Sequence, residues 1–185
     1  WRAWLAGKSG NQALSAELLK KANSGDPGLV FPYLQESVEP LTLAMENSNS
    51  WKPKYYLALI NWNNENREAA KNLFTKCGDE PDFYAFYLAR VKLFESADAV
   101  ATEKDLLKAA ALAPQAWRAA LSLSKFYESK KDYVKSKEVA AAAFAKLPQN
   151  YYLGLNLARQ LSLNNEYEAC VNLLAKLQVL PNEGA

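Results

Sequence analysis

Pairs of nearby carboxylates come nearest to a catalytic motif in this sequence. Glu36 and Glu39 form one pair, and Glu166 and Glu168 form another. Two carboxylates work as a general acid and a general base where a pocket drives their pKa values apart. We interpret the surroundings of both pairs as solvated helix turns, without a flanking basic or aromatic pocket. We therefore expect no catalytic residues and no enzyme activity.

Histidine is absent, and the two cysteines, Cys77 and Cys170, do not have the spacing of a CxxC motif. Histidine and cysteine are the usual zinc ligands, and histidine is the commonest general base. We therefore expect no metal site. In the repeat assignment given below the cysteines lie three units apart, whereas a disulfide needs Cα atoms within about 7 Å of each other. We expect two buried free thiols.

Nucleotide and nucleic-acid binding find little support in the composition. The glycine pairs Gly7 with Gly10 and Gly25 with Gly28 neither follow a strand pattern nor precede the Lys-Ser/Thr of a phosphate-binding loop. Lys and Arg number 22 against 20 Asp and Glu, which gives a net charge of +2. A row of Tyr and Trp rings could stack RNA bases, but so small a charge opposes binding to phosphates. We expect no cofactor and no nucleic-acid partner.

Membrane insertion is not indicated either. The longest fully apolar runs, such as residues 139–145, are far shorter than the roughly 20 residues of a membrane-spanning helix. The chain begins at Trp1 instead of Met and lacks the pattern of a secretion signal, so we interpret it as a piece of a longer protein. We expect no membrane span, and the compartment stays open, with the cytoplasm favoured.

A repeat with a period of 34 residues organises the C-terminal two-thirds of the chain. Its positions hold Leu123, Ser124, Tyr127, Tyr133, Ser136, Ala140 and Ala143 and, 34 residues later (123 to 157), Leu157, Ala158, Leu161, Tyr167, Cys170, Leu174 and Leu177. One period earlier they hold Ala89, Leu93, Thr102, Leu106 and Ala109, with Pro114 and Pro148 at the same phase. A further step of about 32 residues leads to Leu57, Ala58, Ala70, Phe74 and Cys77. This recurrence predicts four units, at 51–82, 83–116, 117–150 and 151–185.

The residue types of the repeat indicate paired helices. Small residues such as Ser124 and Ala158 let two helices approach to about 8–10 Å, while large ones such as Leu123 and Leu157 fill the space between them. One hairpin leaves its apolar face exposed, whereas stacked hairpins bury it. We therefore expect stability to come largely from contacts between neighbouring hairpins.

This pattern resembles the tetratricopeptide repeat (TPR) family over about 135 residues, from residue 51 to the end. The family places a large and a small residue early in the first helix, then Ala, an aromatic residue and Ala in the second helix, and Pro at the end. The family's pair of Ala and an aromatic residue in the second helix is kept only at Ala70 and Phe74. The resemblance implies an all-α, right-handed superhelical solenoid of antiparallel helical hairpins, with about four repeats and an N-terminal helical pair.

The first 50 residues are less regular. Residues 11–22 and 33–46 predict two amphipathic helices, separated by a break at Ser24-Gly25-Asp26-Pro27-Gly28. We interpret this region as a degenerate first repeat or a cap that packs on the unit beginning at Trp51.

A second resemblance concerns the larger context. Residues 31–33, 36–41 and 51–57 resemble the helical tail of large bacterial proteins that carry an N-terminal β-rich domain of unknown function. If so, the β-rich part, connected with carbohydrate metabolism, would carry any chemistry, and the present chain would be one segment of that protein.

The TPR resemblance also implies a binding groove, lined by first-helix positions on the face opposite the core. Those positions hold Lys52, Tyr55, Leu59, Trp62, Asn63, Tyr84, Tyr87, Val91, Phe94, Glu95, Arg118, Leu121, Lys125, Glu128, Tyr152, Leu155, Arg159 and Ser162. The first two units present aromatic rings, and the last two are more cationic. Chaperone-binding members carry Lys and Asn at positions that here hold Tyr55, Leu59, Tyr87 and Val91, so we do not expect a clamp for a terminal carboxylate.

We expect a protein-interaction module or scaffold that binds a peptide or a neighbouring domain of the same polypeptide. The groove would hold an extended or helical peptide with apolar anchors and an acidic group, since aromatic and Arg side chains dominate binding hot spots. In the alternative interpretation, the aromatic stripe packs on itself, on Trp1 and Trp4, or on a missing domain. The polar run at 61–66 fits a turn better than a ligand site.

A different functional class is a structural spacer or self-association arm. The C-terminal helix is strongly apolar and has no obvious polar capping helix, which repeat arrays generally need. Its apolar residues are Leu173, Leu174, Leu177, Val179 and Leu180. This pattern leaves open a homodimer formed through the C-terminal helix.

Overall fold

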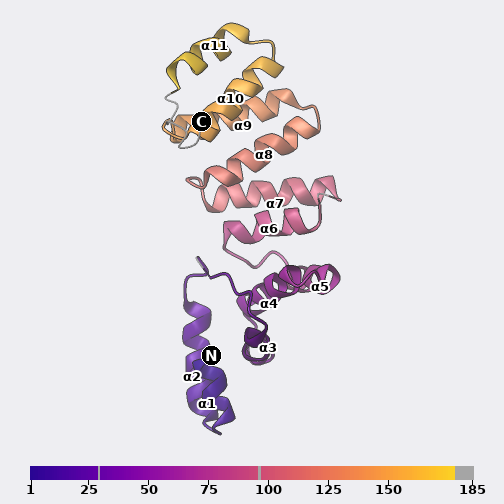
Figure 1. The fold of residues 1–185 in the computed structure, drawn as a ribbon, viewed down its shortest axis with the longest axis vertical. Helices are drawn as coiled ribbons and strands as arrows, with labels where there is room; N and C mark the ends of the chain where they lie inside the picture. The colour runs from indigo at the N-terminus through magenta and orange to yellow at the C-terminus, as the bar shows by residue number, and fades with distance from the viewer. Residues whose placement is uncertain (29, 96, 178–185) are drawn as a thin grey trace. The chain divides into compact units, whose positions relative to one another are not determined.

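The computed structural model describes residues 1–28, 30–95 and 97–177 (Figure 1). The described residues form helices and no β-strand, which confirms the all-α prediction. The helices are α1 (Arg2–Lys8), α2 (Gln12–Ser24), the 3₁₀-helix η1 (Gln35–Ser37), α3 (Val38–Glu46), α4 (Trp51–Asn63), α5 (Arg67–Cys77), α6 (Tyr84–Leu93), α7 (Ala99–Leu112), α8 (Trp117–Ser129), α9 (Tyr133–Lys146), α10 (Tyr151–Leu163) and α11 (Tyr167–Lys176). Among them, none is both long and apolar enough to cross a bilayer.

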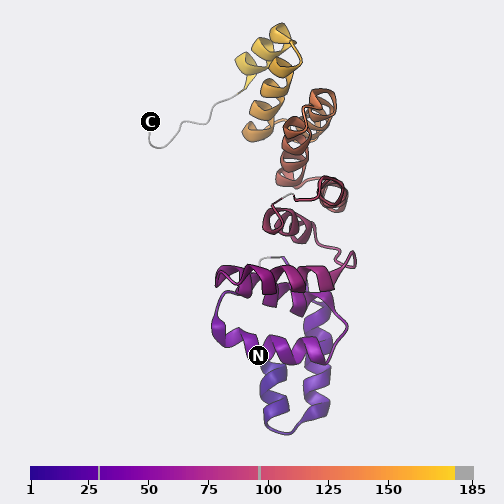
Figure 2. The ribbon, with the colours of Figure 1, turned by 90° about the vertical axis from the view of Figure 1, so that its right-hand side faces the viewer.

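The chain divides into two compact units, Trp1–Phe86 and Tyr87–Ala185, and each is considered on its own. Within the units, consecutive helices pack as hairpins: α1 with α2, α4 with α5, α8 with α9, and α10 with α11 (Figure 2). Helices of successive hairpins also touch, α3 with α4 in the first unit and α9 with α10 in the second. Each unit is therefore built from the neighbour contacts that a solenoid of helical hairpins requires.

Side-chain caps mark where many of these helices begin. Asn66 and Asp132 accept hydrogen bonds from backbone N–H groups in the first turns of α5 and α9, at 3.4 and 3.1 Å. Asn150 caps α10 in the same way, at 3.1 Å from the N–H of Leu153. Because the first N–H groups of a helix have no partner inside the helix, a side-chain oxygen at this position favours helix formation there.

The turns inside the hairpins share an unusual backbone conformation. Glu65, Lys131 and Asn165 have φ angles of 62°, 61° and 62°, in the left-handed region that favours glycine. The next residue then donates its N–H to a carbonyl five positions earlier, for instance Asp132 to Tyr127 at 3.0 Å. This arrangement closes the C-terminal end of the first helix. Three of the four predicted repeats therefore make the same turn.

The first unit has an aromatic core. Phe74 and Phe86 are fully buried, with ring centroids 5.1 Å apart, and Tyr55 lies within 5.7 Å of both. Trp51 extends the cluster to the start of α4, 6.0 Å from Phe86. These rings bury a large apolar area between α4, α5 and the beginning of α6, and edge-to-face contacts add to that stabilisation.

The core of the second unit combines an apolar cluster with a polar contact. Leu106, Leu123, Phe126 and Tyr127 form the apolar cluster. Beside it, α8 and α9 meet at Ser124 and Ser136, both fully buried. The hydroxyl of Ser136 donates to the carbonyl of Ser124 at 2.7 Å, and the hydroxyl of Ser124 donates back at 3.1 Å. The close approach predicted for small residues is thus observed at this hairpin.

The N-terminal region differs from the prediction in two respects. Helix α1 was not expected: it has only seven residues, too few for a clear period, and is held by buried Ala3 and Ala6 and by a bond from the Ser15 hydroxyl to the Ala3 carbonyl at 2.8 Å. Helix α3 begins at Val38 instead of residue 33. The preceding chain is extended at Leu34, where ψ is 133°, so the helical pattern of residues 33–37 yields only a 3₁₀ turn.

We predict that Lys131→Gly stabilises the protein. A non-glycine residue in the left-handed region destabilises the folded state by about 1–2 kcal/mol. Glycine removes this strain, but its greater freedom in the unfolded chain lowers stability by about 0.5–1 kcal/mol. The free energy of unfolding, measured by urea denaturation followed by circular dichroism, should rise by about 0.5–1 kcal/mol.

The matched control is Lys130→Gly. Lys130 adjoins Lys131 but has a φ of −87°, where glycine brings no relief. This variant should lose stability. Equal effects of the two substitutions would show that the left-handed turn is not strained.

Candidate functional site

In the first unit, the predicted groove residue Tyr55 belongs to the core. Its side chain is only 3% exposed, and burial raises the pKa of Tyr55 to about 12. The ring is enclosed by the aromatic cluster of Phe74 and Phe86. We therefore assign Tyr55 to packing, because its ring has no free surface for a partner.

Lys52 is also engaged inside the first unit. Its ammonium group donates hydrogen bonds to the carbonyl oxygens of Asn23, at 2.7 Å, and Gly25. These bonds tie the end of α2 to α4, so Lys52 has a structural role. Of the other predicted residues of this unit, Asn63 is exposed, and the half-buried ones are Leu59, Trp62 and Tyr84.

In the second unit, Tyr87 is likewise a core residue, with 1% of its surface exposed. The guanidinium carbon of Arg90 lies 5.2 Å from the ring centroid, and Arg90 itself is paired with Asp105 of α7. A paired cation over a ring leaves no room for a ligand on that face. Phe94, the next predicted residue on α6, is half-buried.

Val91 of α6 is half-buried, and Glu95 after α6 is exposed. The predicted residues of the last two repeats lie on the neighbouring helices α8 and α10. We call this surface the α8–α10 face. It consists of Trp117, Arg118, Leu121, Lys125, Glu128, Tyr152, Leu155 and Arg159. Arg118, Lys125, Tyr152, Leu155 and Arg159 are exposed. Of the predicted groove, this part alone gathers exposed cations and an exposed ring within one unit.

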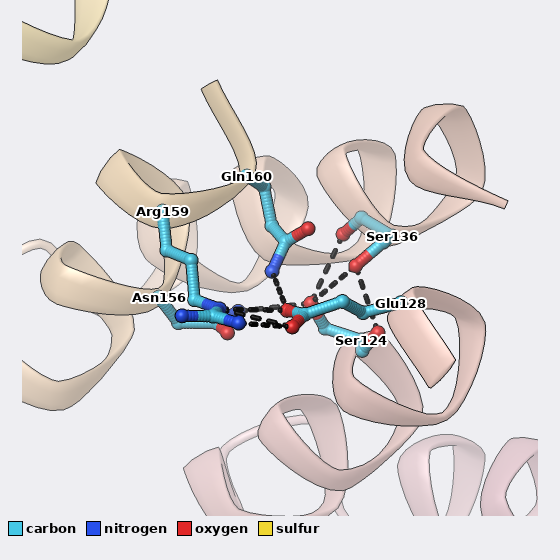
Figure 3. A network of polar contacts seen from close by, with 6 residues as sticks. All are labelled: Ser124, Glu128, Ser136, Asn156, Arg159 and Gln160. Carbon is cyan, nitrogen blue, oxygen red and sulfur yellow. Dashed lines mark hydrogen bonds and ion pairs between the residues drawn. The ribbon is translucent and has the colours of Figure 1, made fainter. Parts of the chain in front are cut away.

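An ion pair closes one end of the α8–α10 face (Figure 3). Arg159 donates to Glu128 through Nη2 at 2.6 Å and through Nε at 2.9 Å. Gln160 donates to the other carboxylate oxygen of Glu128 at 2.6 Å. The carboxylate therefore links α8 to α10 by charge-assisted hydrogen bonds, which are stronger than neutral ones.

The environment of Glu128 favours its charged form. The hydrogen bonds from Arg159 lower the pKa of Glu128 below its usual value, with further lowering by Gln160 and by the nearby charge of Lys125. Partial burial acts in the opposite direction. The side chain of Glu128 is 19% exposed, whereas that of Arg159 is 65% exposed. The guanidinium thus offers most of its surface to solvent even while it is paired.

A buried polar network supports this end of the face. Asn156 of α10 donates to the Ser124 hydroxyl at 2.9 Å, and Ser124 in turn bonds to Ser136 (Figure 3). Gln160 is fully buried, and among the described residues no donor reaches its Oε1 atom. These contacts fix the position of α10 against α8, and therefore the spacing of the exposed cations above them.

An aromatic stack forms the other end of the α8–α10 face. The rings of Trp117 and Tyr152 lie parallel, 7° apart, with centroids separated by 5.1 Å. The guanidinium carbon of Arg118 lies 4.5 Å from the Trp117 ring centroid. Such a stack presents flat apolar surface beside a cation, and Tyr152 is 60% exposed.

The charge of the face is positive. It carries Arg118, Lys125 and Arg159 against Glu128 alone. Among the described residues, neither Arg118 nor Lys125 forms an ion pair with a carboxylate, although the charge of Lys125 acts on nearby Glu128. The helical rise of about 1.5 Å per residue places the aromatic end, at Trp117, roughly 16 Å from the ionic end, at Glu128. The face can therefore attract an anionic group at several points along its length.

The described residues do not gather into a metal site. Of the carboxylates considered above, Glu39 pairs with Lys8 and Glu166 with Lys137. Neither cysteine is in a disulfide; Cys77 is buried as expected, whereas Cys170 is half-buried.

Sequence reasoning missed Trp117, Asn156 and Gln160. A signal for Trp117 was present, because every predicted repeat begins with an aromatic residue: Trp51, Phe83, Trp117 and Tyr151. Asn156 and Gln160 carry no comparable signal, since an amide on a helix usually faces solvent. Their burial depends on the partners that α8 supplies.

Comparison with known proteins shows the fold. No protein-family model matches the chain, and no curated protein matches it in sequence. Among solved structures, MamA 41-end from Desulfovibrio magneticus RS-1 is similar with a TM-score of 0.61 and 17% identity, over 87% of this chain and 92% of that one. YrrB, described as a TPR protein with an unusual peptide-binding site, has a TM-score of 0.61 and 15% identity, over 88% and 80%.

A tetratricopeptide repeat protein from Parabacteroides merdae ATCC 43184 is also similar, with a TM-score of 0.53 and 17% identity, over 94% of this chain and 75% of that one. These likenesses confirm the TPR resemblance at the level of the fold: the chain is an all-α protein of TPR-like helical hairpins. Proteins of this fold serve many purposes, so the function must be argued from the surface.

We predict that Glu128→Gln lowers stability at neutral pH but not at acid pH. Because folding lowers the pKa of Glu128, its charged form stabilises the folded state at pH values above the usual glutamate pKa. That contribution is lost as the pH falls through the lowered pKa. Urea midpoints of wild type and variant should therefore differ at pH 7 and converge as the pH falls below the lowered pKa of Glu128.

Glu138→Gln is the control, because Glu138 is exposed on α9 and has no ion-pair partner among the described residues. It should leave the midpoint unchanged at both pH values. A constant difference between wild type and Glu128→Gln across the pH range would show that the carboxylate's charge is not what stabilises this contact.

Proposed function

We propose that the chain is a protein-interaction module whose α8–α10 face binds an extended peptide that carries an aromatic or apolar anchor and an acidic group. The observation that supports this proposal best is the combination on one face of three exposed cations with the stacked Trp117 and Tyr152 rings. Aromatic and Arg side chains are the residue types that dominate binding hot spots.

Charge complementarity favours an acidic partner. Arg118 and Lys125 form no ion pair among the described residues, so an incoming carboxylate need not break one there. Arg159 is two-thirds exposed and can accept a second carboxylate beside Glu128. Opposite charge also steers encounter, so binding should weaken as ionic strength rises.

The dimensions of the face suit a short extended segment. An extended chain rises about 3.3 Å per residue, so roughly five residues span the 16 Å between the aromatic and ionic ends. Leu121 and Leu155 lie between the two ends and offer apolar contact to a central side chain. We therefore expect an aromatic residue at one end of the peptide and an acidic residue toward the other.

The similar structures support a binding role over a catalytic one. TPR-like repeats typically act as interaction modules, and YrrB is described as having a peptide-binding site. In the second unit the carboxylates of Glu128 and Asp105 are both paired with arginine, an arrangement that suits structural or binding roles. The proposed partner is a peptide of another protein or of another domain of the same polypeptide.

Fluorescence anisotropy tests the proposal with a labelled five-residue peptide library of the pattern aromatic–x–apolar–x–Asp. Binding should weaken about tenfold with Arg118→Glu or Lys125→Glu, since a charged hydrogen bond is lost and repulsion is added. Lys108→Glu is the matched control: it makes the same charge change at an exposed position of α7 and should bind like wild type.

Two outcomes would contradict this proposal. One is equal binding of a library with Lys in place of Asp, because the cations would then play no part. The other is an equal loss of binding in Lys108→Glu, because net charge alone would then account for the effect.

A second candidate function, self-association, is supported by the outer face of α11. Tyr167, Val171 and Leu174 are 60%, 64% and 45% exposed. One repeat earlier, the equivalent face of α9 is covered by the α10–α11 hairpin: Asn164 bonds to the carbonyl of Tyr133, and Lys137 pairs with Glu166. The α11 face therefore has the form of an interface between hairpins, which the α11 face of a second copy could cover.

Not all of the apolar C-terminal residues predicted to form a dimer contact can be assigned to it. Leu177 packs against Gly154 of α10, which leaves it unsuitable as a contact residue. Val179 and Leu180 lie outside the described residues.

We predict that Val171→Glu raises the dissociation constant of a dimer at least tenfold, because it buries a charge in an apolar contact. Light scattering behind size-exclusion chromatography measures this. Ala169→Glu, at an exposed position of the same helix, is the control. A wild-type chain that is monomeric at high concentration would rule out self-association through α11.

A further inference from the structure

The first unit contains a large apolar pocket, and none of the predicted groove residues lines it. Its volume is about 570 Å³, within the range of small-molecule sites. The pocket lies between α1, α2, α3 and the segment that joins α2 to α3, with Tyr56 of α4 at one side. All of its lining residues belong to the same unit.

Aliphatic and aromatic side chains form most of the wall. They are Trp1, Ala3, Trp4, Leu18, Leu19, Ala22, Val30, Pro32, Pro40, Leu41 and Ala44. Trp1 and Trp4 meet edge to face, with ring centroids 5.7 Å apart, and Trp1 is 57% exposed. An open cavity with such a lining exposes apolar surface to water, which is unfavourable unless something covers it.

The charged residues of the lining are both cationic: Arg2 and Lys21. Neither has a carboxylate partner among the described residues. Two carboxylates on adjoining segments are already engaged, Glu39 with Lys8 at 2.6 Å and Asp26 with the backbone N–H of Gly28 at 2.8 Å. The pocket thus pairs an apolar interior with two cations that form no ion pair among the described residues.

Further apolar side chains follow the pocket along the segment between α2 and α3. Phe31, Tyr33 and Leu34 are 64%, 63% and 50% exposed, and Val30 of the lining is 40% exposed. These exposed apolar side chains adjoin the lining residues Val30 and Pro32 in sequence. An elongated apolar ligand fits such a site better than a compact polar one.

From these observations we propose that the first unit binds a single-chain amphiphile with a carboxylate head, its hydrocarbon chain in this pocket and its head group near Arg2 and Lys21. The lining accounts for both parts of the ligand: the apolar walls exclude a polar molecule, and the uncompensated cations select an anionic head. This site is separate from the α8–α10 face, and its existence does not depend on the peptide-binding proposal.

Isothermal titration calorimetry with octanoate, decanoate and dodecanoate, each below its micelle concentration, tests the inference. Affinity should rise about fourfold for each added methylene while the pocket still has room. One ligand should bind per chain. Dodecyltrimethylammonium, which has the same chain and the opposite charge, should bind at least tenfold more weakly than dodecanoate.

Three variants locate the site. Arg2→Gln and Lys21→Gln should each weaken dodecanoate binding about tenfold, because each removes one charged contact. Ala22→Trp places a large ring in the pocket from an exposed lining position and should abolish binding. Lys20→Gln is the matched control, since Lys20 adjoins Lys21 on α2 but does not line this pocket, and it should bind like wild type.

Circular dichroism of every variant separates loss of binding from loss of folding. The proposal is overturned if a folded Ala22→Trp variant binds dodecanoate like wild type, or if the cationic amphiphile binds as tightly as dodecanoate. It is also overturned if affinity does not change with chain length. An assembly that forms in the absence of amphiphile and breaks up with Ala22→Trp would show instead that a second copy covers the pocket.

Discussion

Both units depend on a close approach of two paired helices at small buried residues. In the second unit this contact is made by Ser124 and Ser136, and in the first unit Ala58 and Ala70 occupy the equivalent positions, all of them fully buried. A larger side chain at either position would separate the helices and open the core beside them. The second helix packs on one side of the first helix, so a partner can reach only the part of the opposite, free face that neighbouring elements leave exposed.

The position of that free face decides what the chain can bind. In the second unit, α8 and α10 stand next to each other and combine their exposed side chains into one cationic surface with an aromatic end. The ion pair between Glu128 and Arg159 joins the two helices, and the buried amides beneath it hold their spacing. The candidate site is therefore a product of the packing between repeats, and no single hairpin contains it.

The sequence predicted the helical hairpins well because their determinants are local and recur. Helices α4, α8 and α10 begin at residues 51, 117 and 151, where the 34-residue period places the first helix of a unit. The period could not predict the helices of the N-terminal region, because that region does not repeat. Helix α1 is one short element held by tertiary contacts, and the start of α3 is set by an extended segment at Leu34.

The groove was predicted less completely, for a physical reason. Helical phase identifies the side of a helix on which a residue lies, but it does not say how far neighbouring elements cover that side. On the same predicted face, Arg118 and Lys125 of α8 are exposed, whereas Tyr55 and Tyr87, which stand at the repeat position of Leu121, are enclosed by other rings or by an arginine. Burial of a large aromatic side chain stabilises the folded state strongly, so such a residue packs into a nearby apolar cluster.

The hydrogen bond from Asn156 to Ser124 has a consequence for how the array assembles. Repeat proteins consist of similar hairpins, so a folding chain can stack a hairpin on the wrong neighbour and become trapped. One repeat earlier, the position of Asn156 is taken by Ser122, whose side chain is shorter. The buried amide of Asn156 donates its hydrogen bond to Ser124. If α10 packed on another helix, this amide would be buried without that partner, which is destabilising. This single polar contact therefore favours packing of the α10–α11 hairpin on the α8–α9 hairpin over packing on the similar apolar surfaces of other hairpins.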